Sequence, residues 1–125
     1  MDDSFRQPSR PSIEVEAVSA WVSVATLRGE HDLGSKAEVA DGLARACDRA
    51  YVVVDMSECS FIDSTIISVL LSAHRKQLER DGRLELVIPS EAEAIRRIVN
   101  LASLDALLTI HQTRAGALAS VQPEE

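Results

Sequence analysis

The feature that most constrains the fold is a continuous apolar run, YVVVDM at residues 51–56. Its β-branched residues follow one another without the polar alternation of a half-exposed strand. Such a run is typical of a strand buried on both faces, the usual position of a central strand in a parallel sheet. Parallel neighbours must be joined by crossover connections, and most of these are helices. The run therefore predicts an α/β domain.

Strand and helix patterns alternate along the rest of the chain. The first two strands are expected to pair as a hairpin across Ser19 and Ala20, and Gly29 is expected to end the second. The predicted strands cover residues 13–18, 21–28, 51–56, 84–88 and 107–110, and the predicted helices cover 32–50, 64–80, 90–102 and 114–121. This order predicts a mostly parallel mixed sheet of four to five strands, with an antiparallel N-terminal edge strand and about four helices.

A chain of 125 residues is long enough for one domain with a single core. We expect that domain to cover residues 13–121. The polar, proline-containing segment 1–12 and the final QPEE at 122–125 are predicted to be flexible tails. Ser90 and Glu93 have the spacing of a capping box and are expected to start the third helix.

The charge balance argues against two classes of main partner. The chain has 20 acidic and 13 basic residues, a net charge of −7, whereas nucleic acids and anionic membranes require clustered lysine and arginine. No apolar run approaches the roughly 18 residues of a membrane span, and the N-terminus does not resemble a signal peptide. We therefore expect a cytoplasmic protein that binds neither nucleic acid nor membrane.

The sequence indicates no metal or cofactor site. Cys47 and Cys59 lack CxxC spacing and have no histidines at zinc-ligand distances, so both are expected to be free, buried thiols. The phosphate-binding patterns GxxxxGK[ST] and GxGxxG are absent, so we assign no nucleotide site.

The most apolar helix, predicted from residue 64, begins at a polar pair, Asp63 and Ser64. One of the two is expected to be the N-cap, which accepts hydrogen bonds from the first free backbone N–H groups. The other is left at a helix N-terminus, where a phosphate would be met by backbone donors. Spacing alone leaves a structural cap and a modified serine both open. The loops after the strands at 21–28 and 51–56 follow the same sheet edge and are expected to meet.

One face of this helix is predicted to pack on the sheet. The apolar positions on that face are Ile66, Ile67, Leu70, Leu71 and Leu78. His74 falls within the stripe and is expected to be a core or edge histidine with a hydrogen-bond partner.

The segment VVVDMSECSFIDSTIISVLL, residues 52–71, resembles the phosphorylation-site segment of the STAS-domain anti-anti-sigma factors. In that family a strand, an Asp, a short loop and an aromatic-aliphatic pair precede Asp-Ser-Ser/Thr-Gly. The matching residues are Asp55, Phe61, Ile62, Asp63, Ser64 and Thr65. Upstream, LRGEHDL resembles the family's Gly-Glu-x-Asp, and the matching residues are Gly29, Glu30 and Asp32. Ile66 stands where the family usually has glycine.

The resemblance implies an anti-sigma factor antagonist, which is not an enzyme. The unmodified form binds an anti-sigma factor that is also an ATP-dependent serine kinase, and a sigma factor is released. The kinase phosphorylates Ser64, which separates the complex, and a metal-dependent serine phosphatase restores the active form. The expected partner or kinase contacts are Glu30, Asp32, Asp63, Thr65 and Ile66. The chain is expected to be a monomer or weak dimer without a cofactor of its own.

Two other functions stay open at this point. Some STAS domains are docking or scaffold modules in sensory or transport assemblies and are never phosphorylated. A hydrolytic triad of Ser64, an aspartate and a histidine is the second alternative. The GxSxG turn of such hydrolases is absent, and His74 is expected on the apolar face of the helix, so this alternative has little support.

Overall fold

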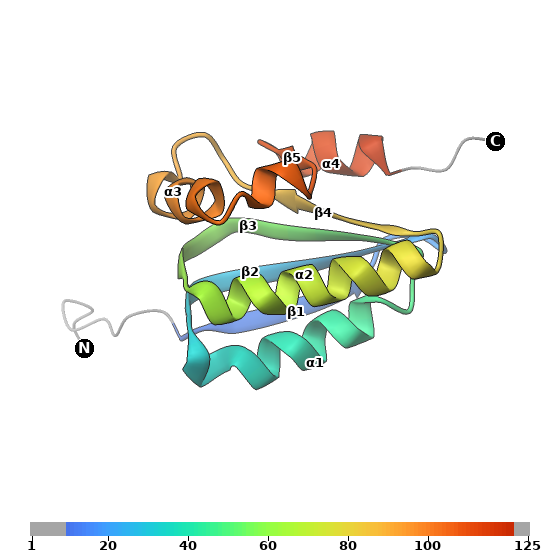
Figure 1. Ribbon diagram of the computed structural model, residues 1–125. Helices are drawn as coiled ribbons and strands as arrows, with labels where there is room; N and C mark the ends of the chain where they lie inside the picture. Colours follow the sequence, from blue (N-terminus) through green and yellow to red (C-terminus); the bar gives the residue numbers. More distant parts are fainter. Residues whose placement is uncertain (1–9, 122–125) are drawn as a thin grey trace, which may run out of the picture.

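The fold is built on one five-stranded sheet in which consecutive strands are neighbours. The computed structural model describes residues 10–121. The strands are β1 (Ser12–Ala17), β2 (Val22–His31), β3 (Tyr51–Ile62), β4 (Arg83–Val87) and β5 (Ile110–His111). The helices are α1 (Lys36–Ala46), α2 (Ser64–Glu79), α3 (Glu93–Leu101) and α4 (Arg114–Ser120), with short 3₁₀ helices η2 (Leu33–Ser35) and η3 (Leu104–Ala106). β1 pairs antiparallel with β2 and all other pairs are parallel, which confirms the predicted class and edge hairpin (Figure 1).

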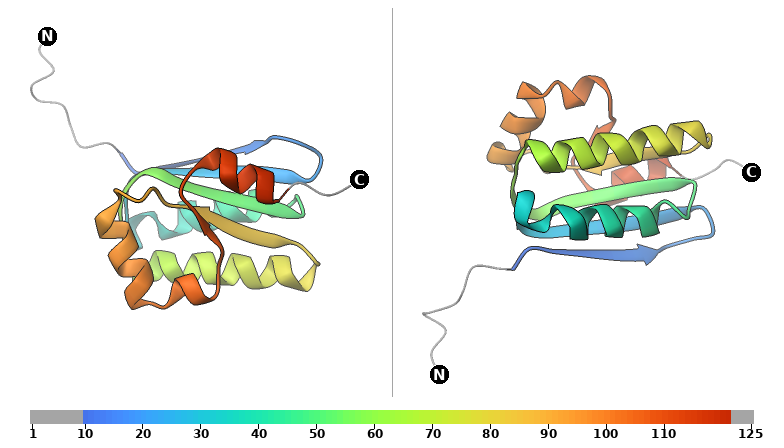
Figure 2. Two further views of the ribbon diagram at one scale, coloured as in Figure 1. Left: turned by 90° about the horizontal axis from the view of Figure 1, so that it is seen from above. Right: turned by 60° about the horizontal axis from the view of Figure 1, so that its bottom comes forward.

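Helices cover both faces of the sheet, and this explains the apolar run at its centre. α1 and α2 lie side by side on one face, and α4 lies on the other (Figure 2). Along β3, Val52 and Val54 belong to the larger core, whereas Val53 belongs to a smaller core that includes Ala117 of α4. All three valines are fully buried. β3 is therefore the doubly covered central strand that the apolar run predicted.

β2 and β3 are both longer than predicted. β2 continues through Gly29 to His31, and β3 continues to Ile62 through residues that were expected to form a loop. Gly29 has a φ of 85°, which glycine adopts without the steric cost of a side chain, and the pairing register shifts before and after it. Gly29 therefore bends the strand pair without ending it, and the exposed residues of the bulged region, such as Glu58, hid the strand pattern.

The predicted capping box of the third helix is wrong. α3 begins at Glu93 with Ala92 as its N-cap and without a side-chain cap. The Ser90 hydroxyl donates to the carboxylate of Glu91 at 3.2 Å. The Ala92 N–H bonds to the carbonyl of Pro89 at 3.1 Å, so a turn occupies the residues that were expected to open the helix.

The last turn of α2 buries a glutamine rather than the predicted leucine. Leu78 is 51% exposed, whereas Gln77 is fully buried. The Gln77 amide donates to the carbonyls of Arg49 at 2.7 Å and Ala50 at 2.9 Å, just before β3. These carbonyls need donors, and a buried glutamine supplies them where a leucine could not.

The other element ends differ from prediction by a few residues. α1 begins at Lys36 because η2 precedes it, and β5 has only two residues. Residues 1–9 and 122–125 of the predicted tails lie outside the described residues, and Ser12, predicted as tail, begins β1.

The structure also describes the two cysteine thiols and the length of the helices. Cys47 and Cys59 are free and buried as predicted, and burial raises the pKa of both thiols. Over residues 10–121, no helix is both long enough and apolar enough to cross a membrane.

Candidate functional site

β2 and β3 end side by side, and this brings both sequence motifs to one edge of the sheet. Glu30 pairs with Phe61 in the parallel register, and the next residue of each strand is its last. Just beyond these ends, the backbone of Leu33 is close enough to the carboxylate of Asp63 to contribute to lowering its pKa. The two segments therefore meet, as the strand directions predicted.

Asp63, not Ser64, is the N-cap of α2. Its backbone is extended, and its Oδ1 accepts the N–H groups of Thr65 at 3.0 Å and Ile66 at 3.3 Å. The Thr65 hydroxyl, which donates to the same carboxylate, lowers the pKa of Asp63 most, and the backbone donors add to this effect. Asp63 is therefore the ionised N-cap of α2, and Ser64 is the residue left at the helix N-terminus.

The cap leaves Ser64 as the exposed first residue of α2. Thr65 differs from it in two respects, because it is only partly exposed and its hydroxyl is engaged by Asp63. Of the two neighbouring hydroxyls, the one on Ser64 is the more accessible to a second protein.

Asp32 is a cap as well as a surface acid. Its Oδ1 accepts the N–H of Gly34 at 2.8 Å, and its own N–H donates to the Ser35 hydroxyl at 3.3 Å, which closes a capping box at η2. Asp32 and Glu30 are both exposed. The structure thus puts the acids Glu30, Asp32 and Asp63 along one edge, next to Ser64.

Ile66 is not at the surface. Its side chain has 0% exposure and belongs to the larger core together with Leu70 of the same helix. The expectation that Ile66 contacts a partner is therefore corrected, because a side chain without exposed area can act on a partner only through its neighbours. The departure from the family's glycine changes the packing beneath α2 rather than the surface above it.

Two exposed apolar side chains, which the sequence analysis did not assign to the site, flank this edge. Leu33 is 67% exposed and Phe61 is 41% exposed. Leu33 is exposed because η2 precedes α1, and a continuous helical pattern through this segment concealed that break. Phe61 follows a bulge near the end of β3, so its side chain does not enter the core.

Two of the three histidines form contacts away from Ser64. The buried His31 contacts the Ser35 hydroxyl through Nδ1 at 2.9 Å, and His111 contacts the buried carboxylate of Glu85 through Nε2 at 2.7 Å. Both contacts hold turns or strand ends together.

His74 lies ten residues beyond Ser64 on α2, which is about 15 Å along a helix axis. Its Nδ1 is buried and has no hydrogen-bond partner within residues 10–121, so the predicted partner is missing at this atom. Burial lowers the pKa of His74, although the charge of Glu85 and the backbone of Leu107 oppose that effect. A hydrolytic pair with Ser64 is therefore not formed.

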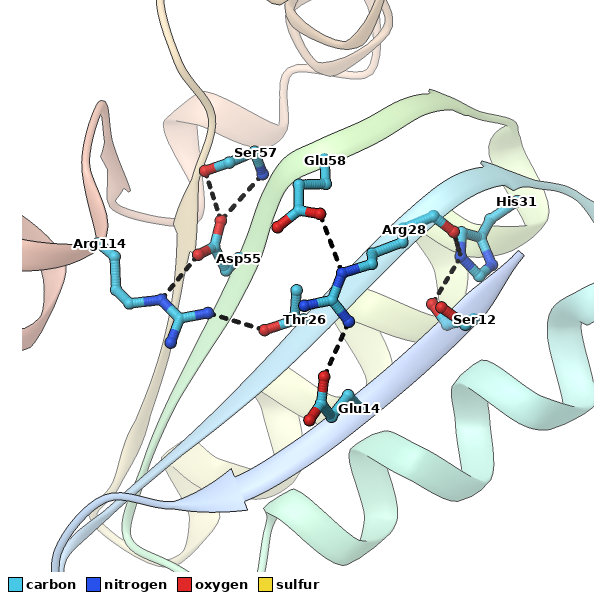
Figure 3. Close-up of polar contacts among 9 residues, drawn as sticks. All are labelled: Ser12, Glu14, Thr26, Arg28, His31, Asp55, Ser57, Glu58 and Arg114. Atoms are coloured by element: carbon cyan, nitrogen blue, oxygen red, sulfur yellow. Dashed lines mark hydrogen bonds and ion pairs between the residues drawn. The ribbon is translucent and has the colours of Figure 1, made fainter. Parts of the chain in front are cut away.

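Asp55, the aspartate of the strand motif, faces the opposite side of the sheet from α1 and α2. Figure 3 shows its carboxylate held by Ser57 and by Arg114, the first residue of α4. The Arg114 Nε donates to Asp55 at 2.9 Å, and another of its nitrogens donates to Thr26 at 2.8 Å. Burial alone would raise the pKa of Asp55, but the bonds from Ser57 and Arg114 outweigh it and lower that pKa. Asp55 therefore anchors α4 to β2 and β3.

We expect Arg114→Ala to lower the free energy of unfolding by about 2 kcal/mol, because it leaves a 5% exposed carboxylate without its cation. The matched control is Arg28→Ala. Arg28 also bonds two acids, Glu14 at 2.8 Å and Glu58 at 3.0 Å (Figure 3). Both of these pairs are exposed and should contribute less than about 1 kcal/mol. Urea unfolding of both variants measures the difference.

The pH dependence provides a second readout of the Arg114 variant. The pKa of Asp55 is lower in the folded protein than in the unfolded chain, so the contribution of the ionised carboxylate is complete above the unfolded-state pKa and is lost as the pH falls through the lower, folded-state pKa. The loss caused by Arg114→Ala should shrink accordingly in acid. Equal losses for the two arginine variants, or a loss that does not depend on pH, would contradict this account.

The edge has no apparent metal-ligand set. Among the described residues, no group of three or more histidine, cysteine, aspartate or glutamate side chains could hold a metal ion. The features that the edge does offer are an accessible hydroxyl, an ionised cap, nearby acids and two apolar side chains. These are suited to recognition by another protein.

The comparisons with known proteins agree with the fold. A family model described as STAS domain matches residues 13–117. A search of curated proteins finds no match. Similar solved structures include an anti-sigma factor antagonist from Mycobacterium paratuberculosis, with 24% identity over 91% of this chain and 96% of that chain and a TM-score of 0.81.

Two further structures show a related protein in two states. The anti-sigma factor antagonist SpoIIAA in its unphosphorylated form is 21% identical over 88% of this chain and 96% of that chain, with a TM-score of 0.70. The Bacillus cell fate determinant SpoIIAA in the phosphorylated form is 21% identical over 89% of this chain and 100% of that chain, with a TM-score of 0.68. At these identities the likeness is one of fold.

Proposed function

Because the chain belongs to the STAS domain family, we propose that it is an anti-sigma factor antagonist that is switched by phosphorylation of Ser64. In this proposal the unmodified protein binds an anti-sigma factor with serine kinase activity and releases a sigma factor in the cytoplasm. The kinase supplies the ATP site, and a serine phosphatase reverses the modification. The chain itself performs no catalysis.

The observation that carries the proposal is the position of Ser64. It is the exposed first residue of α2, directly after a cap that is already formed by Asp63. Its hydroxyl can therefore be reached by a kinase without any change in the helix. The neighbouring Thr65 is a weaker candidate because its hydroxyl already bonds to Asp63.

The Asp63 cap also determines which backbone N–H groups are available to a phosphate on Ser64. A phosphoserine carries about −1.5 to −2 charges and seeks the free N–H groups of a helix N-terminus. The N–H groups of Thr65 and Ile66 are already taken by the ionised Asp63. A phosphate on the exposed Ser64 would lack these two donors and add charge beside the ionised Asp63, so we expect loss of binding by local repulsion without refolding.

The same geometry supports a contact role for the acids rather than a catalytic one. The pKa of Asp63 is lowered, and its carboxylate accepts three hydrogen bonds from donors of its own helix, so it is a poor proton acceptor. The base that deprotonates the Ser64 hydroxyl then belongs to the kinase. Glu30 and Asp32 are exposed and can contact the partner surface beside it, although Asp32 also caps η2.

The proposal is tested by recovering the protein from its own cells in the presence of ATP and mapping phosphate by mass spectrometry. We expect phosphate on Ser64, its loss in Ser64→Ala and its retention in Thr65→Ala. A protein that is recovered with stable partners but never carries phosphate on Ser64 would instead support the docking-module function.

A further inference from the structure

A groove between α1 and α2 is separate from the Ser64 edge. It has a volume of about 280 Å³ and lies on the outer side of the helix pair. Buried apolar side chains, including Leu43, Val69 and Ala73, form its floor. Figure 2 shows the two helices running side by side over the sheet, without another element of the described chain above them.

The charge of the groove is opposite to that of the protein. The chain has 13 basic residues, and only two of them, Lys36 and Lys76, are lysines. Both line this groove, and none of its described lining residues is acidic. Neither lysine forms an ion pair within residues 10–121. In a chain with a net charge of −7, this groove is a local cationic site.

Helix stability does not explain the position of Lys36. It is the first residue of α1, where the positive end of the helix dipole repels a cation. A stability role would favour an acidic residue at this position. The exposed ammonium group therefore remains available to an anionic group outside the chain.

The lysines mark the two ends of the groove. α1 has 11 residues and begins at Lys36, so the groove along it is about 16 Å long. The charge of Lys76 acts on the thiol of Cys47, which follows the last residue of α1. Lys36 and Lys76 therefore stand at opposite ends, with an apolar floor between them.

We propose that this groove binds a helix of another protein that carries two acidic side chains about 16 Å apart on one face, with small apolar residues between them. Two carboxylates about eleven residues apart on a helix lie on the same face at this distance. A helix laid in a groove between two others is an established mode of protein recognition. The acids pair with Lys36 and Lys76, and the small residues cover the floor.

This inference goes beyond the proposed function, because it requires neither a phosphate nor a kinase. One end of the groove is nevertheless close to the Ser64 edge, since Ser68, which lines it, is one helical turn beyond Ser64. A partner seated in the groove therefore reaches the candidate site, although each surface is tested separately.

The test uses a synthetic helical peptide of about sixteen residues, rich in alanine, with two glutamates about eleven residues apart. Reductive methylation with ¹³C labels the two lysines, whose signals are followed by NMR during titration. Both lysine signals should shift saturably with this peptide. The same peptide with lysines in place of the glutamates is the control and should leave them unchanged.

Protein variants provide the second arm of the test. Lys36→Glu combined with Lys76→Glu should weaken peptide binding at least about tenfold. Arg75→Glu makes the same charge change at an exposed neighbour that does not line the groove, and should change affinity less than about twofold. Unmoved lysine signals at millimolar peptide, or equal weakening by Arg75→Glu, would overturn the proposal. The comparison of the two peptides uses the unmutated protein, so it does not depend on how the variants fold.

Discussion

Ile66→Ala is expected to lower the free energy of unfolding by about 3 kcal/mol, because it removes a wholly buried side chain and leaves a cavity beneath the first turn of α2. Ile66→Val removes a single methylene and should cost about 1 kcal/mol. Leu101→Ala provides the control, since Leu101 is 79% exposed and its truncation should cost less than about 0.5 kcal/mol. Urea unfolding followed by circular dichroism measures all three.

The ordering of these three variants tests whether Ile66 is a core residue or a contact residue. A core residue gives a large loss of stability with Ile66→Ala, and Ile66→Val then leaves partner affinity unchanged in the folded protein. A contact residue gives the reverse, with a small loss of stability and a clear loss of affinity. The second pattern would restore Ile66 to the docking surface and contradict the packing described above.

Phosphorylation of Ser64 is expected to weaken binding of the proposed anti-sigma factor partner at least about 100-fold, which corresponds to about 2.7 kcal/mol. The added dianion stands beside the ionised Asp63, which already accepts the N–H groups of Thr65 and Ile66, so these two donors are not available to the phosphate. Ser64→Asp adds a single charge on a shorter side chain and should produce a smaller loss in the same direction. Isothermal titration with the partner recovered in the phosphate-mapping experiment measures both.

Two controls separate a local effect from a change in net charge. Ser120→Asp adds the same charge at the exposed end of α4 and should alter affinity less than about twofold. Ser64→Ala removes the hydroxyl without adding charge and should retain binding. If phosphorylated protein bound the partner as tightly as unmodified protein, the switch would have to lie elsewhere on the chain.

The motifs at the candidate edge were largely predictable because they are local. Asp63 and Ser64 precede an apolar helical pattern, and the sequence limited the N-cap to these two residues. The choice between them depended on backbone conformation, because Asp63 is extended whereas Ser64 is already helical. The exposure of Leu33 was missed for a similar reason, since η2 and α1 share one helical pattern in the sequence.

The predictions from sequence were wrong mainly where a contact with a segment distant in sequence, and not the local residue pattern, decides the structure. Gly29 was expected to end β2, but pairing with β3 carries the strand through a bulge. Leu78 was expected in the core, but Gln77 is buried at that end of α2 instead, where its amide donates to the carbonyls of Arg49 and Ala50 just before β3. In both cases hydrogen bonds to a segment distant in sequence outweighed the pattern within the segment itself.

The sequence by itself determined the α/β class, the hairpin at the sheet edge, the central position of β3 and the polar pair at the start of α2. These follow from periodicity, β-branched runs and capping residues, which are properties of short segments. Only the tertiary structure decided that Ile66 is buried, that Arg114 anchors to an aspartate 59 residues away, and that both lysines line one groove. Burial and pairing of this kind depend on which segments the fold brings together, and no single segment contains that information.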